Sequence, residues 1–148
     1  MTFLSTKTYG HEIGLSAVFR QWKASSHCNL LHGYSLAFRF VFETDELDYR
    51  NWVVDFGGLK GLKLRLQNVF DHKTVVAEDD PQLQTLLSLQ DKKIAEVVIV
   101  PAVGCEKFAE LAAQFAQEEL KALGIAERVR VAEVECSEHG ANSAIYRP

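Results

Sequence analysis

The chain has 148 residues, a length that fits one domain, so we expect residues 1–148 to fold as a single unit. With 47% hydrophobic and 24% charged residues, its composition is that of an ordinary soluble globular protein. A net charge of -4 without a basic stripe argues against nucleic-acid binding and membrane-surface helices, and no hydrophobic run is long enough to span a membrane. The three cysteines are odd in number and widely spaced, and the N-terminus has no signal-peptide pattern, so we expect free thiols in a cytoplasmic protein.

The first part of the chain predicts two strands joined by a loop. Residues 8–21 predict a strand, because apolar side chains recur at every second position from Ile13 to Phe19. Residues 34–43 give the clearest strand, with aromatic and aliphatic side chains on one face and mostly polar ones on the other. The two strands could pair across residues 22–31, a connection long enough to hold functional residues.

The rest of the chain predicts helices alternating with strands. Asp55 is a candidate N-cap for a helix whose apolar residues recur from Leu59 to Val69. The further predicted elements are a short helical piece at 81–89, a β-branched strand at 94–100, an amphipathic helix at 106–123 and a strand at 129–138. This order predicts an α+β fold in which helices cover one face of a single sheet. Because the other face has nothing to cover it, we expect an oligomer.

The loop between the first two strands contains the most reactive set of side chains. His27, Cys28 and His32 fall within six positions, and Tyr34 shares its strand face with His32. A thiol acts as a base or nucleophile only as the thiolate, and a nearby imidazolium lowers its pKa. The same pattern also fits a buried cysteine between two surface histidines.

Two acidic positions are also candidates, and a third, Glu106, has no assigned chemistry. Asp71 directly precedes His72, where a carboxylate could orient an imidazole for proton transfer. Glu138 ends the last predicted strand, and a carboxylate there could bind an N–C–N edge through two parallel hydrogen bonds. Taken alone, each also fits an ordinary polar end of a helix or strand. Glu106 fits the preference for a carboxylate at a helix start.

Taken together, these segments resemble the 6-pyruvoyltetrahydropterin synthase and 6-carboxytetrahydropterin synthase family. Each matching segment is short, and their order over roughly residues 15–146 makes the resemblance specific. The matching segments are Cys28-Asn29-Leu30-Leu31-His32-Gly33, Val54-Asp55-Phe56 with Leu59-Lys60, Phe70-Asp71-His72, Glu106, and Glu138 with Ile145-Tyr146.

The resemblance implies a T-fold, with an antiparallel four-stranded sheet and two main helices on one face. In this family the sheets of neighbouring subunits form barrels, as trimers or hexamers with active sites between subunits. The resemblance implies that Cys28 is the general acid/base, that Asp71 and His72 are its relay partners, and that Glu138 anchors the pterin. The implied substrate is 7,8-dihydroneopterin triphosphate, converted to 6-carboxytetrahydropterin on the route to queuosine.

The chain departs from the family at the zinc site, where three histidines are expected. Phe19 stands at the first ligand position and Tyr34 at the third, so only His32 remains. Catalytic zinc sites normally need three protein ligands, so an ordinary site is not expected. Two interpretations stay open: His27 joins His32 in a rebuilt site, with His139 or Tyr34 assisting, or no zinc binds and the chemistry is altered or lost.

Three functions remain compatible with these residues. The first is the lyase described above, favoured by Cys28, Asp71, His72 and Glu138. The second is a related pterin enzyme with another substrate or product, such as a dephosphorylated pterin, 6-pyruvoyltetrahydropterin or a cleaved side chain. The third is a non-catalytic pterin-binding protein. Cys28 disfavours the folate-linked subtype, which has glutamate at that position.

Overall fold

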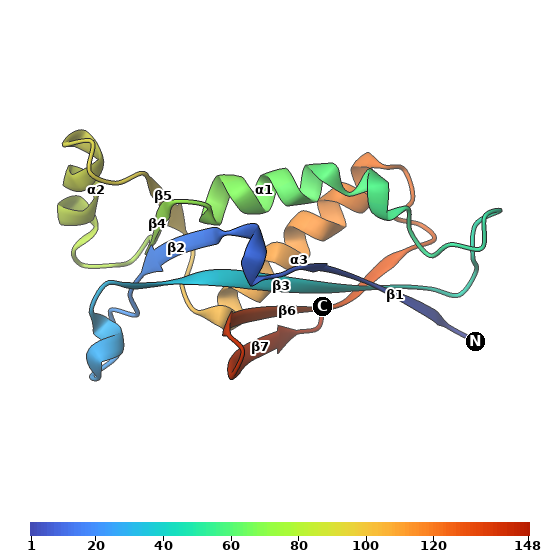
Figure 1. Ribbon diagram of the computed structural model, residues 1–148, viewed down its shortest axis with the longest axis horizontal. Coiled ribbons are helices and arrows are strands. Elements are labelled where there is room, and N and C mark those ends of the chain that lie inside the picture. Colours follow the sequence, from blue (N-terminus) through green and yellow to red (C-terminus); the bar gives the residue numbers. More distant parts are fainter.

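The structure is a computed structural model and describes residues 1–148. A central sheet lies beneath two long helices, and a third, shorter helix lies beyond one end of the sheet (Figure 1). The strands are β1 (Phe3–Tyr9), β2 (Leu15–Phe19), β3 (His32–Thr44), β4 (Lys73–Ala77), β5 (Val97–Val100), β6 (Arg130–His139) and β7 (Asn142–Tyr146); the α-helices are α1 (Lys60–Phe70), α2 (Leu83–Asp91) and α3 (Cys105–Ala122). None of these helices has both the length and the hydrophobicity of a transmembrane span.

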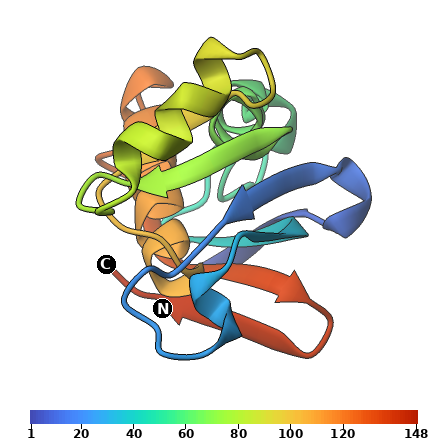
Figure 2. The same ribbon diagram turned by 90° about the vertical axis from the view of Figure 1, so that its left-hand side faces the viewer.

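The sheet has seven strands in the order β5-β4-β2-β3-β6-β7, and β1 pairs with β3 beside β2. It curls from β4 through β2 and β3 towards β7 (Figure 2). The expected α+β class is confirmed, but the expectation of four antiparallel strands is wrong in number and direction. β4 runs parallel to β2, and β5 runs parallel to β4, so the sheet is mixed.

The predicted strand at 8–21 covers the last two residues of β1, a turn and the whole of β2. A short 3-10 turn at His11–Ile13 separates β1 from β2, and Gly14 leaves that turn with a positive φ of 81°. Both strands lie along the same edge of β3: β2 pairs with its first half and β1 with its second half. Pairing with the long strand β3 therefore keeps β1 and β2 aligned, although the chain between them turns.

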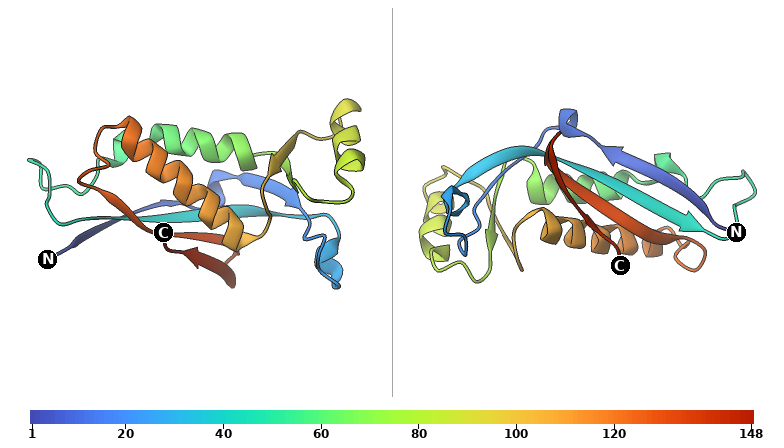
Figure 3. Two further views of the ribbon diagram at one scale, coloured as in Figure 1. Left: turned by 180° about the vertical axis from the view of Figure 1, so that it is seen from behind. Right: turned by 90° about the horizontal axis from the view of Figure 1, so that it is seen from below.

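The core lies between the sheet and the helices α1 and α3, which both cover one face (Figure 3). The predicted alternation in β3 is confirmed, because Leu36, Phe38, Phe40 and Phe42 are completely buried. The expected cap at Asp55 belongs to a turn just before α1: its carboxylate accepts a hydrogen bond from the N–H of Gly57 (3.0 Å). α1 and α3 contribute Leu62, Leu66, Phe70, Phe108, Ala109, Ala112 and Ala116 to the core.

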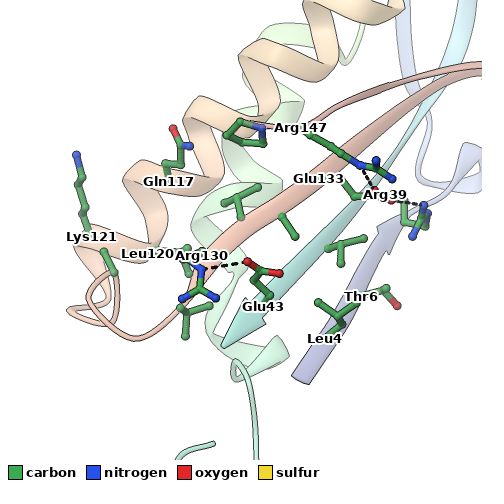
Figure 4. A pocket seen from close by; sticks show the side chains of 16 residues that line it. Leu4, Thr6, Arg39, Glu43, Gln117, Leu120, Lys121, Arg130, Glu133 and Arg147 are labelled. Atoms are coloured by element: carbon green, nitrogen blue, oxygen red, sulfur yellow. Dashed lines mark hydrogen bonds and ion pairs between the residues drawn. The ribbon is translucent and has the colours of Figure 1, made fainter. Parts of the chain in front are cut away.

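No helix covers the opposite face of the sheet (Figure 3). Ion pairs cross it, among them Arg39–Glu133 (3.0 Å) and Arg130–Glu43 (3.0 Å). The largest cavity, about 790 Å³, opens beside this face between β1, β3, β6 and the C-terminal half of α3 (Figure 4). β7 pairs with β6 only from Val134 onward, so residues 130–133 have a free outer edge, and β1 pairs only with β3. Both sides of this part of the sheet therefore end in unpaired backbone.

Candidate functional site

A cavity of about 350 Å³ opens where the loop before β3, the start of α3 and the β6–β7 hairpin meet. Cys28, His32 and Glu138 all line it. The first two come from the loop and the beginning of β3, whereas Glu138 comes from the end of β6. Three side chains that the sequence offered as candidates are thus brought to one place by the pairing of β3 with β6.

Three aromatic rings form one wall beside this cavity. Phe19 is paired directly with His32 across β2 and β3, and Tyr34 lies two residues further along β3 on the same face. The ring centroids are 5.7 Å apart for Phe19 and His32, and 5.4 Å for His32 and Tyr34. The Phe19 and Tyr34 centroids are 6.2 Å apart, so the three rings form a compact triangle. We call these three residues the ring triangle.

The two histidines of the loop lie in different environments. His32 Nδ1 lies 2.7 Å from the carbonyl oxygen of Leu30, which accepts a hydrogen bond from the Nδ1–H tautomer. In that tautomer Nε2 keeps its lone pair. His27 is exposed on the short turn His27–Asn29 and does not line the cavity. The structure does not bring His27 to His32.

Gly33 allows β2 and β3 to approach closely at the ring triangle. A Cβ at this position would lie 2.6 Å from the carbonyl oxygen of Ala17 and 3.1 Å from Cγ2 of Val18. The carbonyl is backbone of the paired strand, so it cannot move aside without disturbing the sheet.

We expect Gly33→Ala to lower the free energy of unfolding by about 2 kcal/mol, because overpacking forces the two strands apart. Urea unfolding measures the change. Gly140→Ala is the matched control, since a Cβ there meets nothing within 4 Å, and it should change stability by less than about 0.5 kcal/mol. Equal stability of the two variants would contradict the close approach.

A buried ion pair holds the loop that contains Cys28. Arg20 follows β2 and binds Asp80 through two hydrogen bonds, Nε–Oδ2 at 2.9 Å and Nη2–Oδ1 at 2.7 Å. Arg20 Nη1 also donates to the side-chain and main-chain oxygens of Asn29, at 3.1 and 3.2 Å. Asn29 Nδ2 in turn donates to the carbonyl oxygens of Trp22 (2.7 Å) and Ala24 (3.3 Å). Asn29, the neighbour of Cys28, is therefore held by hydrogen bonds both within its own loop and to Arg20 at the end of β2.

The Arg20–Asp80 pair was missed in the sequence, because its members are far apart in the chain and neither stands in a recognisable motif. Asp80 has only 1% of its side chain exposed. The hydrogen bond from Arg20 lowers the pKa of Asp80 below its usual value. The carboxylate is thus held in its charged form by its partner.

Two carboxylates line the cavity, Glu106 at the start of α3 and Glu138 at the end of β6. Neither makes a hydrogen bond or ion pair within the chain, and no lysine or arginine lines the cavity. Burial, followed by the charge of Glu138, raises the pKa of Tyr34, so its hydroxyl stays protonated at neutral pH. No chemistry was expected of Glu106 from the sequence, which places it only at the start of a helix.

All three cysteines are free thiols, and they differ in access. Cys136 is completely buried on β6, and a hydrogen bond to Cys105, together with burial, raises its pKa well above the usual value. Cys105 is nearly buried where α3 begins, at the edge of the cavity. Cys28 is only partly buried and lines the same cavity, so it is the most accessible of the three thiols.

Asp71 and His72 form a close pair between α1 and β4. His72 Nδ1 lies 2.6 Å from Asp71 Oδ1, and the backbone N–H of His72 donates to the carbonyl of Ser16 (2.8 Å). The His72 side chain is 87% exposed, and neither residue lines the cavity of Cys28. Within one chain, the expected relay pair therefore stays outside the cavity.

The donor atoms at the ring triangle do not fit a zinc ion. Phe19 has no lone pair, the tyrosine hydroxyl of Tyr34 is not among the usual zinc ligands, and only Nε2 of His32 remains as a good ligand. No three His, Cys, Asp or Glu side chains of the chain lie close enough together to share a metal ion. Catalytic zinc sites use three protein ligands, so the triangle lacks two of them.

The curled sheet with helices on one face defines a T-fold protein. The sequence model of the 6-pyruvoyl tetrahydropterin synthase family matches residues 10–148. The 6-carboxy-5,6,7,8-tetrahydropterin synthase of Aquifex aeolicus is 27% identical over 138 residues, which cover 90% of this chain and 84% of that protein. The chain belongs to the 6-pyruvoyl tetrahydropterin synthase family, a family of pterin lyases, as its motifs implied.

Two solved structures show the same fold. An uncharacterized protein from Wolinella succinogenes superposes with a TM-score of 0.83 at 22% identity, covering 99% of this chain and 98% of that one. The 6-pyruvoyl tetrahydropterin synthase of Plasmodium falciparum gives a TM-score of 0.71 at 14% identity, with the same coverage. The expected T-fold is therefore confirmed.

Proposed function

We propose that this protein is a lyase that converts 7,8-dihydroneopterin triphosphate to 6-carboxytetrahydropterin, a step towards queuosine and other deazapurines. The observation that carries the proposal is the single cavity lined by Cys28, His32 and Glu138. The name of the Aquifex aeolicus relative supports this product over others.

Glu138 is proposed to anchor the pterin ring. The 2-amino group and the neighbouring ring N–H of a pterin form an N–C–N edge that a carboxylate binds through two parallel hydrogen bonds. Glu138 faces the cavity with no partner of its own, so its oxygens are available to such an edge. The pterin side chain would then extend towards Cys28.

Cys28, Asp71 and His72 are proposed to move the protons. Releasing triphosphate breaks a C–O bond, releasing acetaldehyde breaks a C–C bond, and one water molecule is taken up to balance the carboxylate product. These steps need protons taken from or given to the side chain. As thiolate, Cys28 can take a proton from the substrate. The Asp71 carboxylate accepts the hydrogen bond from His72 Nδ1–H, which leaves Nε2 free to exchange a second proton.

We further propose that His72 reaches the cavity of a neighbouring subunit in a homo-oligomer, a trimer or a hexamer. Its exposed side chain and its distance from the chain's own cavity support this arrangement. The unpaired backbone of β1 and of residues 130–133 offers strand edges through which copies can pair. The sheet face without helices would then be enclosed within the assembly.

A second candidate substrate is a reduced pterin without the triphosphate. The cavity is lined by two carboxylates and by no lysine or arginine, so the chain's own charges repel a triphosphate there. The poor fit of the ring triangle to zinc removes a further positive charge that would offset this repulsion.

Incubating the purified full chain with dihydroneopterin triphosphate and with dihydroneopterin in parallel, with products identified by mass, tests both candidates. Formation of 6-carboxytetrahydropterin from the triphosphate is the expected result. Turnover of dihydroneopterin alone would favour the second candidate, and tight pterin binding without any product would mean a non-catalytic binding protein.

The anchor can be tested with the same assay. Glu138→Gln should lower kcat/KM by about 30- to 100-fold, because it removes a charge-assisted pair of hydrogen bonds. Glu133→Gln is the matched control on the same strand: its carboxylate binds Arg39 and Arg147 on the helix-free face, away from the cavity, and activity should be nearly unchanged. Equal kinetics for the two variants would exclude Glu138 as the anchor.

A further inference from the structure

Phe19 is part of the hydrophobic core. Its side chain is buried, with 4% exposure, and its ring packs edge-on against Phe108 with centroids 5.0 Å apart. Phe108 packs in the same way against Phe70 (5.1 Å), and Phe70 packs against Phe38 (5.0 Å). Phe19 is thus the outer member of a row of four rings, two of which, Phe108 and Phe70, belong to α3 and α1, and this packing fixes its position.

The other two members of the ring triangle are also committed to contacts. His32 is oriented by its hydrogen bond to the Leu30 carbonyl, and its ring meets that of Tyr34 at 84°. The ring of Tyr34 lies beside His139, with centroids 6.0 Å apart. The triangle is therefore packed on both sides, by the core at Phe19 and by the β6–β7 hairpin at Tyr34.

We infer that the ring triangle has taken the place of the family's metal centre and that this protein binds no zinc there. Only one nitrogen of the triangle can act as a ligand, and the packed ring of Phe19 occupies the space that a second ligand would need. His27 stays outside the cavity, so it does not complete the set. The lack of a zinc site does not depend on which pterin is the substrate, because it follows from the metal-ligating side chains alone.

The geometry also assigns the loss of the metal site to two positions, Phe19 and Tyr34. Phe19 and Tyr34 flank His32 within 5.7 Å of its ring, so histidines at both positions would direct three imidazoles to one point between β2 and β3. Three imidazoles are a common ligand set for catalytic zinc. The double variant Phe19→His/Tyr34→His should therefore gain a metal site that the natural chain lacks.

The first experiment measures zinc in the natural protein. The full-length protein is incubated with excess zinc, dialysed and analysed by mass spectrometry of the metal, alongside the variant His32→Ala. Zinc well below one ion per chain is the expected result for the natural protein. Zinc that the natural protein and His32→Ala bind in equal amounts would lie at another place in the chain, which also agrees with the inference. About one zinc per chain that His32→Ala loses would overturn it.

The second experiment measures the gain of the site. The double variant should hold about one zinc per chain, and with cobalt it should give the visible absorption bands of a tetrahedral site. Phe19→His alone is the matched control, because it supplies only two imidazoles and should hold much less metal. A folded double variant without metal would overturn the assignment to these two positions; if that variant does not fold, the measurement on the natural protein still decides the main inference.

Discussion

Replacing Cys28 by alanine is expected to lower turnover of the pterin substrate by about 10³-fold, the usual effect of losing a general acid or base. Cys28 lines the cavity with Glu138 and is the most accessible of the three thiols, whereas Cys136 is buried and held in its protonated form. Steady-state kinetics with product analysis measure the change. His27→Ala is the matched control from the same turn, because His27 lies outside the cavity, and it should keep nearly full activity.

The effect of Cys28→Ala can also show whether the site is shared between subunits. His72→Ala should be as inactive as Cys28→Ala if His72 supplies the second proton from a neighbouring copy. Unfolding and refolding the two variants together would then restore about a quarter of the sites, because only some pairs of neighbours combine both natural residues. No recovery in mixed oligomers would place Cys28 and His72 in the same subunit or remove His72 from the mechanism.

Replacing Asp80 by alanine is expected to lower the free energy of unfolding by about 3 kcal/mol, because it leaves the mostly buried Arg20 guanidinium without its partner. Asp79→Ala is the matched control. Asp79 lies next to Asp80, but it is 52% exposed and pairs with the exposed Lys23, so its loss should change stability by less than about 1 kcal/mol. Similar midpoints of unfolding for the two variants would show that the Arg20–Asp80 pair contributes little.

The same ion pair predicts a dependence of stability on pH. Because the hydrogen bond from Arg20 lowers the pKa of Asp80 in the folded state, its stabilising effect is complete above the unfolded pKa, about 3.9. It is lost as the pH falls through the lower, folded pKa. The difference in stability between the natural protein and Asp80→Asn should therefore be constant near neutral pH and shrink below about pH 4. A difference that grows in acid would contradict the sign of the pKa shift.

The central elements of the fold could be predicted from the sequence because their patterns are long and regular. The alternation around Phe38 and the helical spacing in 106–123 each repeat over several turns or residues, so neighbouring positions support one another. The strands β4 and β7 have five residues each, and both start with two polar residues, so only three apolar residues mark each of them. The parallel pairing of β4 with β2 depends on contacts between distant segments, and no local pattern records them.

The candidate site was only partly visible in the sequence. Cys28 and His32 stand in one short motif. Glu138 was recognisable as a carboxylate at a strand end, and its place before Ile145-Tyr146 in the family pattern distinguished it from an ordinary strand end. Arg20 and Asp80 were not recognisable, because an arginine after a strand and an aspartate in a turn are common everywhere. Their significance comes from burial, which only the packed structure shows.

The attachment of Asn29 to Arg20 has an evolutionary consequence. It secures the backbone next to the reactive thiol, while Ser25, at the exposed tip of the same loop, makes no side-chain hydrogen bond. The tip of this loop can therefore accept substitutions or insertions, and with them new neighbours for the ligand, while the thiol keeps its position. Evolution can therefore change the exposed tip, whereas Arg20 and Asn29 must be kept if the thiol is to hold its position.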